Sequence, residues 1–415
     1  MEWKKGVNKE VDLRDLFSRF SWIEEFQVSP DGEHIGVVVK TGEEENEFDV
    51  WADGKFWGKP YERIWYLRYS PAGKLTAIVS EMGENTLAVD GQEWEEKFAF
   101  IWNTLFSEDG QHIASAIQND MKYGMALDGK VWEHLYDNAN GFVLSPQGDR
   151  TAAVVQTVSL GQADVFKFKL GCFSVAVDGK SWEENFVSVW TPVFNHTGQK
   201  VAAQVRPSIY EYTIAIDGIM WPETFSAVWE PVFHPVNNSV IAPVKKDGLW
   251  GLAMDAKIIW PAKFNQLWQM QFSADGNKIV GLGAPEFGKW TVIEDAKPWN
   301  TCFTDMISDL SLSPDAKTIA AIGKNGEKWF VVVNDTVWPE SWDMAWAPVI
   351  SPDAQHVAVK VEKNKRYTVI LNGKPYKKDF EQLWEPCFSP DGKYIMLRYI
   401  SQQTYQREIV PIASW

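Results

Sequence analysis

The chain has 415 residues, of which 45% are hydrophobic and 14% aromatic, so it can build a large packed core and is not disordered. Its formal net charge of −16 argues against nucleic acid and anionic membrane surfaces as partners, because proteins that bind these usually present a basic face. Only three cysteines occur, far apart, which excludes Cys-x-x-Cys metal sites and haem attachment motifs.

The first twelve residues contain no apolar stretch of the kind found in signal peptides. No run of about 18 apolar residues occurs later, so no segment is expected to span a membrane. We therefore expect a cytoplasmic protein in which residues 1–12 form an N-terminal extension.

From residue 26 onward, the chain repeats a turn of the Ser-Pro-Asp-Gly type between two apolar strands, beginning with Ser29-Pro-Asp-Gly32. The Ser, or the residue that replaces it, marks ten copies at positions 29, 70, 107, 145, 195, 234, 273, 313, 351 and 389. Successive marks lie 37 to 41 residues apart, except for a spacing of 50 after position 145, where residues 156–170 are expected to form a surface insertion or a seam. Such a period indicates a repeat fold.

Most repeats continue with a second strand and then a third strand that ends in Asp-Gly followed by Trp, as in Val89-Asp-Gly-Gln-Glu-Trp94. Asp-Gly between apolar strands predicts a tight hairpin, because both turn positions need a positive φ. Four short strands in about 38 residues are typical of one propeller blade.

Most of the 23 tryptophans follow the same period. One set closes the Asp-Gly turn, and a second set stands eight residues later, before the first strand of the next repeat. A residue repeated in nearly every blade is most simply a packing element between blades, with a stacking platform for sugars or bases as the alternative. The pairs with this spacing are Trp57 and Trp65, Trp94 and Trp102, Trp182 and Trp190, Trp221 and Trp229, Trp260 and Trp268, and Trp338 and Trp346.

These repeats predict an all-β propeller of about ten four-stranded blades over residues 13–415. The chain ends at Trp415, a position that closes a turn, and residues 13–22 resemble the segment that follows this position in other repeats. The N-terminal segment is therefore expected to complete the last blade and remove its free edge. This closure favours one ring of ten blades over the alternative of two five-bladed propellers.

The sequence contains no Gly-x-Ser-x-Gly elbow, P-loop or His-Glu-x-x-His motif, so we expect no enzyme activity, no cofactor and no metal site. Two charged clusters depart from the repeat. Residues 43–47 are acidic, and residues 363–366 with Lys377 and Lys378 are basic. Each is interpreted as a solvated loop, with a docking surface as the alternative.

The Ser-Pro-Asp-Gly strand-turn-strand unit resembles the TolB/WD40-like propeller repeat over residues 22–415. Together with the paired tryptophans in most repeats, the whole chain resembles the tryptophan-rich soluble subunit of the Tmc transmembrane redox complex of sulfate-reducing bacteria. In that family the other subunits are a periplasmic multihaem cytochrome, a membrane cytochrome b and a cytoplasmic iron–sulfur protein.

The resemblance implies a non-catalytic accessory subunit of an electron-transfer complex linked to sulfate respiration. It would dock on the cytoplasmic iron–sulfur subunit and reach the inner membrane only through its partners, and it would contact the periplasmic cytochrome only indirectly. The alternative functions are a ligand-binding or glycan-binding propeller and a cryptic propeller hydrolase.

Overall fold

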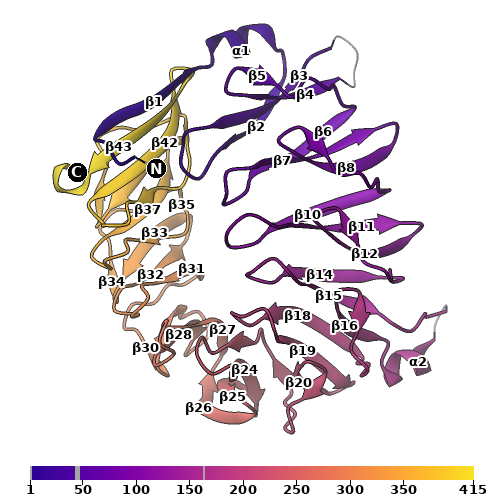
Figure 1. Cartoon of the computed structure of the whole chain (residues 1–415). Coiled ribbons are helices and arrows are strands. Elements are labelled where there is room, and N and C mark those ends of the chain that lie inside the picture. Colours follow the sequence, from indigo (N-terminus) through magenta and orange to yellow (C-terminus); the bar gives the residue numbers. More distant parts are fainter. Residues whose placement is uncertain (1, 43–46, 162–163) are drawn as a thin grey trace.

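The computed structural model of the protein describes residues 2–42, 47–161 and 164–415. Within these residues the strands form ten antiparallel sheets, which follow one another around a single ring (Figure 1). The predicted propeller of ten four-stranded blades is therefore confirmed. The two-ring alternative does not describe this chain.

Each blade is named by its place in the chain, and its strands are counted in the order in which they pair. The first strands, which are split into two pieces in blades 6, 9 and 10, are β2 (Ile23–Val28), β6 (Arg63–Tyr69), β10 (Phe100–Phe106), β14 (Ala139–Leu144), β18 (Ser188–Phe194), β22 (Ala227–Val228) with β23 (Val232–Phe233), β27 (Gln266–Phe272), β31 (Met306–Leu312), β35 (Met344–Ala345) with β36 (Val349–Ile350), and β40 (Gln382–Leu383) with β41 (Cys387–Phe388). The second strands are β3 (Ile35–Lys40), β7 (Leu75–Glu81), β11 (Ile113–Asn119), β15 (Thr151–Gln156), β19 (Val201–Ser208), β24 (Val240–Lys246), β28 (Ile279–Ala284), β32 (Ile319–Asn325), β37 (Val357–Lys363) and β42 (Tyr394–Ser401).

The third strands are β4 (Phe48–Ala52), β8 (Glu84–Val89), β12 (Lys122–Leu127), β16 (Phe173–Val177), β20 (Glu211–Ile216), β25 (Leu249–Met254), β29 (Thr291–Glu294), β33 (Lys328–Val333), β38 (Arg366–Leu371) and β43 (Thr404–Pro411). The fourth strands are β5 (Lys55–Phe56), β9 (Gln92–Glu93), β13 (Lys130–Val131), β17 (Lys180–Ser181), β21 (Ile219–Met220), β26 (Lys257–Phe264), β30 (Lys297–Pro298), β34 (Thr336–Val337), β39 (Lys374–Pro375) and, in blade 10, β1 (Gly6–Asp12). The described residues also form helices α1 (Arg14–Arg19) and α2 (Val165–Leu170) and a 3₁₀ turn (Ile412–Ser414). No helix in these parts of the chain is long and apolar enough to cross a membrane.

The predicted hairpins between third and fourth strands are present, and the residue that opens each turn also fixes the second strand. In blade 5, Asp217 adopts φ +49° and its Oδ1 accepts a hydrogen bond from the Val201 N–H at 2.9 Å. In blade 8, Asn334 does the same for Ile319 at 2.9 Å, with φ +46°. Asn and Asp tolerate this left-handed conformation better than other side chains do. One side chain therefore serves both the turn and the strand beside it.

The Ser of the repeated turn is buried, and it organises the loop between the first and second strands. Ser273 Oγ donates to Asp275 Oδ1 at 2.6 Å and accepts from the Lys278 N–H at 3.0 Å. Hydrogen bonds from Ser273 and from the backbone hold the pKa of Asp275 at about 2. The motif is thus a self-contained hydrogen-bonded loop, which explains why it can be copied from blade to blade.

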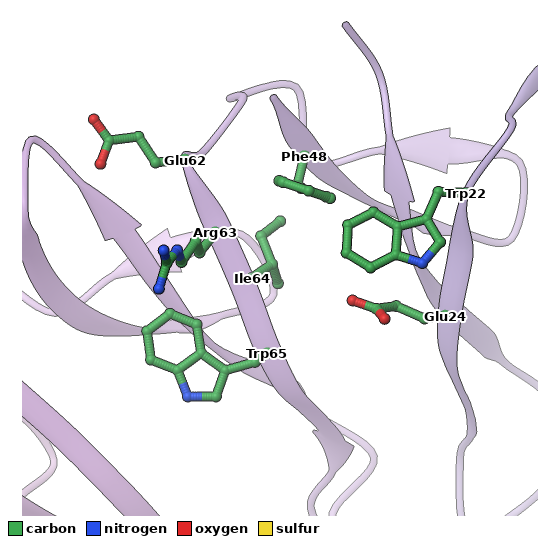
Figure 2. Close-up of a pocket in the computed structure, with 7 residues that line it drawn as sticks. All are labelled: Trp22, Glu24, Phe48, Glu62, Arg63, Ile64 and Trp65. Atoms are coloured by element: carbon green, nitrogen blue, oxygen red, sulfur yellow. The ribbon is translucent and has the colours of Figure 1, made fainter. Parts of the chain in front are cut away.

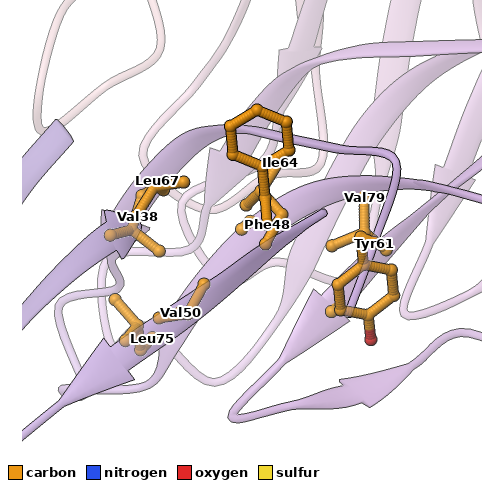
Figure 3. Close-up of a cluster of buried hydrophobic side chains, with 10 residues drawn as sticks. Val38, Phe48, Val50, Tyr61, Ile64, Leu67, Leu75 and Val79 are labelled. Atoms are coloured by element: carbon orange, nitrogen blue, oxygen red, sulfur yellow. The ribbon is translucent and has the colours of Figure 1, made fainter. Parts of the chain in front are cut away.

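The hydrophobic core is divided into clusters that lie between neighbouring blades. Between blades 1 and 2, Val38 and Val50 of blade 1 pack with Ile64, Leu67 and Leu75 of blade 2 (Figure 3). Because every blade buries apolar side chains on both faces, its stability depends on both neighbours.

The ring closes through strand β1, which pairs antiparallel with β43 from Gly6 opposite Ile409 to Asp12 opposite Thr404. Residues 1–12 are predicted from the sequence to be an extension, whereas in the structure residues 6–12 belong to the sheet of blade 10. Residues 14–19, within the segment expected to complete that blade, form helix α1. The insertion expected at residues 156–170 lies between β15 and β16 and contains α2, and its residues 162 and 163 lie outside the described chain.

Candidate interaction surface

The two ends of the blades carry different loops. At the end that carries the repeated Ser turns, adjacent blades are hydrogen-bonded directly, as from the Glu108 N–H to Pro146 O at 3.0 Å and from the Ala274 N–H to Pro314 O at 2.7 Å. At the opposite end, the loops between second and third strands lie beside the segments that lead into the first strands. There the Ala99 N–H donates to Asn119 Oδ1 at 3.0 Å within blade 3. We call these loops and segments the hairpin rim; in blades 2 and 3 its hairpins point away from the ring (Figure 1).

The hairpin rim exposes large apolar side chains on several blades. The loop between second and third strands carries one or more of them in blades 2, 3, 4, 5 and 7, and these side chains are between 80% and 90% exposed. Exposed apolar groups gathered on one side of a protein mark interaction sites, whereas scattered ones need no explanation. We call the following set the apolar arc: Met82, Met121, Phe166, Leu170, Tyr210 and Phe287.

The blades also separate enough at the hairpin rim to leave a cleft of about 480 Å³ between blades 1 and 2. The indole of Trp22 lies on one side of this cleft and the indole of Trp65 on the other, with the Glu24 carboxylate pointing between them (Figure 2). Trp22 packs edge-on against Phe48, with ring centroids 5.0 Å apart. The cleft is lined by Trp22, Glu24, Phe48, Glu62, Arg63, Ile64 and Trp65.

Blade 1 departs from the repeat at this cleft. In blade 2, Trp65 stands five residues before Ser70, whereas Trp22 stands seven residues before Ser29, so Glu24 occupies the place of the usual tryptophan. Both first strands shift register at this place, after Glu24 and after Trp65. The exception to the repeat, and not the repeat itself, therefore places a carboxylate at the mouth of the cleft.

Two neighbouring carboxylates behave differently at this bulge. Glu25 bridges the blades, since its oxygens accept from the Tyr66 N–H at 3.1 Å and from the Leu67 N–H at 2.6 Å. Glu24 has no hydrogen-bond partner among the described residues; burial, helped by repulsion from Glu25, raises its pKa. A carboxyl group in a cleft with a perturbed pKa is a candidate binding group.

A second cleft, of about 410 Å³, continues the first toward blade 3. It shares Glu62, Arg63 and Trp65 with the first cleft and adds Phe100, which is 62% exposed. Together the two clefts form an aromatic groove across blades 1–3, beside the Met82 end of the apolar arc. Aromatic rings with one exposed face supply large contact area with little loss of side-chain freedom, as is typical of recognition surfaces.

The predicted site tryptophans occupy two different environments. Those that close a turn lie against the next blade: Trp57 Cγ is 3.1 Å from the position where a Cβ on Gly91 would be, and Trp94, Trp182 and Trp338 approach Gly129, Gly218 and Gly373 in the same way. Trp221 and Trp260 are buried in the clusters between blades 5 and 6 and between blades 6 and 7.

The tryptophans of the first strands pack instead against an aromatic residue of the third strand in their own blade. Trp102 lies near Tyr123, Trp190 near Tyr212, Trp229 near Trp250, Trp268 near Trp290 and Trp346 near Tyr367, with ring centroids 5.6 to 6.2 Å apart. Trp65 lines the clefts described above. Both sets are predicted from the sequence to pack between blades, but in the structure the tryptophans of the second set are partly exposed at the hairpin rim.

Much of the basic cluster of blade 9 is engaged within the protein. Arg366 Nε pairs with Asp379 Oδ1 at 2.9 Å, and Lys378 Nζ lies 3.4 Å from Glu408 Oε2. Lys363 Nζ lies 5.4 Å from the centre of the Trp342 ring. Most of the acidic segment, residues 43–46, lies outside the described residues.

The described residues contain no group of three or more His, Cys, Asp or Glu side chains that could hold a metal ion. Burial raises the pKa of the thiols of Cys172 and Cys302, which favours their protonated and unreactive form. What the described side chains offer at the hairpin rim is therefore apolar contact, aromatic faces and isolated charges.

Comparison with known proteins gives no family and no function. No family model and no curated protein matches the chain. Among solved structures, the Dos1 propeller is 11% identical over 97% of this chain and 95% of its own, with a TM-score of 0.33. The Cps50 (Swd1) β-propeller domain of Myceliophteria thermophila is 11% identical over 66% of this chain and 97% of its own, with a TM-score of 0.32.

The tricorn protease is 12% identical over 91% of this chain, with a TM-score of 0.30. This chain spans less than half of that protein, 43% of its length. The architecture described above follows from the strand pairing of this chain.

Proposed function

We propose that this propeller is a non-catalytic scaffold that binds a partner protein through its hairpin rim. The observation that carries the proposal is the apolar arc. Loops of blades 2, 3, 4, 5 and 7 expose apolar side chains to water, and covering them with another protein surface would lower the free energy. The aromatic groove across blades 1–3 extends the same rim. Surfaces of this composition resemble the buried centres of protein interfaces.

Acidic side chains supply the polar surroundings of the arc and define the partner further. Glu95, Glu96, Glu183 and Glu184 lie in the segments that lead into the first strands of blades 3 and 5, and they are exposed. Together with the net charge of −16, they favour a partner whose contact surface is apolar and bordered by basic residues.

We further propose that the partner is the cytoplasmic iron–sulfur subunit of a membrane redox complex, so that the chain would reach the membrane only through other subunits. The support for this finer step is the resemblance of the tryptophan-rich repeat to the soluble Tmc subunit. No cofactor is required of this chain for such a role, since it would position its partner and leave electron transfer to haem and iron–sulfur groups.

The test is affinity purification of the full chain from detergent-solubilised membranes of the native cells. We expect haem and iron–sulfur proteins to co-purify with the wild-type chain, and the Met82→Lys, Met121→Lys double variant to lose them. Val236→Lys is the matched control, because Val236 is 64% exposed but lies in the Ser turn of blade 6, at the opposite end of the blades. Retention of the same partners by the double variant would contradict binding through the apolar arc. Recovery of the chain alone would contradict the redox partner.

A further inference from the structure

Several blades cover the aromatic residue of their third strand with a cation from their own second strand. A positive charge above an aromatic ring is attracted by the electrons of the ring face, and the attraction increases when water is excluded. In blades 5, 6 and 8 the cation and the ring centre are 5.2 to 5.8 Å apart, for Arg206 over Tyr212, Lys245 over Trp250 and Lys324 over Trp329. In blade 9, Lys360 Nζ lies 4.4 Å from Trp346 and 4.9 Å from Tyr367.

Blade 7 lies between these blades and lacks the cation. The pairing of Gly283 with Thr291 puts Ala284 opposite Trp290, the position at which blades 6 and 8 carry Lys245 and Lys324. Within the described chain, no lysine or arginine lies over Trp290 or over Trp268, its neighbour at 5.6 Å. The aromatic pair is therefore present in blade 7 without the cation that accompanies it in the neighbouring blades 6 and 8.

A cavity of about 550 Å³ opens at this aromatic pair. Trp229 of blade 6, which is 45% exposed, and the exposed Glu230 also line this cavity. In contrast to the cleft beside blade 1, which includes Arg63, this cavity has no cationic lining. It is lined by Trp229, Glu230, Gln266, Trp268, Gln269 and Trp290.

We propose that this cavity binds a lysine or arginine side chain of the protein that docks on the hairpin rim. The indoles of Trp229, Trp268 and Trp290 would contact the aliphatic stem and the charged head, as the aromatic rings of blades 6 and 8 contact their own lysines. Glu230 supplies the opposite charge, and Gln266 and Gln269 supply hydrogen-bond acceptors for the remaining N–H groups. The inference rests on the proposed function for the identity of the partner, but the cavity lies apart from the groove of blades 1–3.

The experiment uses the full chain with ¹⁵N-labelled tryptophan and two small probes that share a four-carbon side-chain stem. The probe is Nα-acetyl-lysine methylamide, and the neutral control is Nα-acetyl-norleucine methylamide. The indole N–H resonances of Trp229 and Trp290 are assigned with the Trp229→Phe and Trp290→Phe variants. We expect the lysine probe to shift these two resonances in a saturable manner, and the norleucine probe to leave them unchanged.

Ala284→Lys places a lysine at the position that Lys245 and Lys324 occupy in blades 6 and 8. This lysine would cover Trp290 in place of the probe, so we expect probe binding to weaken by about tenfold or more. Gln118→Lys is the matched control, since Gln118 pairs with Tyr123 at the corresponding position of blade 3 and adds the same charge far from the cavity. Glu230→Gln, an exposed substitution that does not disturb packing, is expected to weaken binding several-fold and keeps the test decisive if Ala284→Lys does not fold.

Equal shifts with both probes, or unchanged lysine binding in Glu230→Gln, would overturn the cation site. These outcomes are independent of the purification from membranes. Loss of partner binding on mutation of the apolar arc together with absent probe binding would leave the scaffold function standing and remove only this site. Probe binding together with the recovery of no partner protein would support the cation site and contradict the scaffold function.

Discussion

The guanidinium of Arg407 lies 3.2 Å from the carboxylate of Glu33, across the boundary at which the last blade meets the first. Arg407 is only 1% exposed, and its Nε also donates to Asp31 O at 2.8 Å. Tyr405 OH donates to Gly32 O at 2.7 Å from the same strand. The third strand of blade 10 thus holds the Ser turn of blade 1 by its backbone carbonyls, a contact between residues more than 370 positions apart.

Arg407→Ala is therefore expected to destabilise the ring strongly. The substitution removes a buried guanidinium, leaves the partly buried carbonyl of Asp31 without this donor and leaves Glu33 without its partner, effects that together reach about 3 kcal/mol. Arg366→Ala is the control, because Arg366 pairs with Asp379 at the surface, where such pairs contribute about 1 kcal/mol or less. Urea denaturation of the three proteins measures the difference. Equal midpoints for the two variants would show that the closure does not limit stability.

Removal of residues 1–12 is expected to open the ring and promote association. Without β1, the strand β43 presents its free edge to solvent, and such an edge pairs readily with another chain. Size-exclusion chromatography with light scattering should show dimers or larger species for this variant. Removal of residues 1–5 alone keeps β1 and should leave the mass unchanged. A monomeric variant lacking residues 1–12 would mean that the edge is protected in another way.

Those features of the fold that repeat could be predicted from the sequence. The turn opened by Asp217 depends on a local conformational preference and therefore leaves a similar signal in each of the first nine blades. The blade count and the role of the N-terminus in closure follow from counting those signals. Fold prediction succeeded here because each element is specified within about 40 residues of sequence.

The tryptophans of the candidate site belong to the repeat, but the features that distinguish one blade from another could not be predicted, because they are departures from it. Glu24 takes the place of a tryptophan, Ala284 stands where blades 6 and 8 carry a lysine, and Met82 is one hairpin residue among many polar ones. A comparison of repeats identifies the residues that most repeats share and overlooks such exceptions. The effect of each exception also depends on side chains of the neighbouring blade, which the spacing of residues in the sequence does not describe. The residues of the apolar arc did leave a signal in the sequence, because they are apolar residues in the connections between second and third strands.

Gly91→Ala is expected to destabilise the protein more than Gly54→Ala, although both glycines occupy the same position of the Asp-Gly turn. Gly54 has φ +89°, and no atom lies within 4 Å of the position that a Cβ would take, so alanine there meets only the left-handed strain of about 1–2 kcal/mol. Gly91 has φ +80°, and its Cβ would lie 3.1 Å from Trp57 Cγ. Overpacking adds about 1 kcal/mol or more. Thermal unfolding of both variants tests whether Trp57 packs against this turn, and equal melting temperatures would contradict it.

The cluster around Glu93 predicts a stability change in acid. Burial of the carboxyl opposes its ionisation, but hydrogen bonds from Lys59 at 2.6 Å, from Lys97 and from Tyr61 at 3.0 Å outweigh burial and lower the pKa of Glu93 to about 2. A glutamate in the unfolded chain has a pKa of about 4.3. The folded state therefore binds the proton of Glu93 less tightly than the unfolded state does, so the stabilisation is complete above about pH 5 and is lost as the pH falls from about 4.3 to about 2.

The free energy of unfolding of Glu93→Gln should be lower than that of wild type at pH 7, and the difference should narrow as the pH falls from about 4.3 to about 2. Glu84→Gln, an exposed substitution in the same blade, corrects for the change in net charge. A difference between wild type and Glu93→Gln that stays constant from pH 7 to pH 2 would show that the carboxylate of Glu93 does not stabilise blade 2 through these hydrogen bonds.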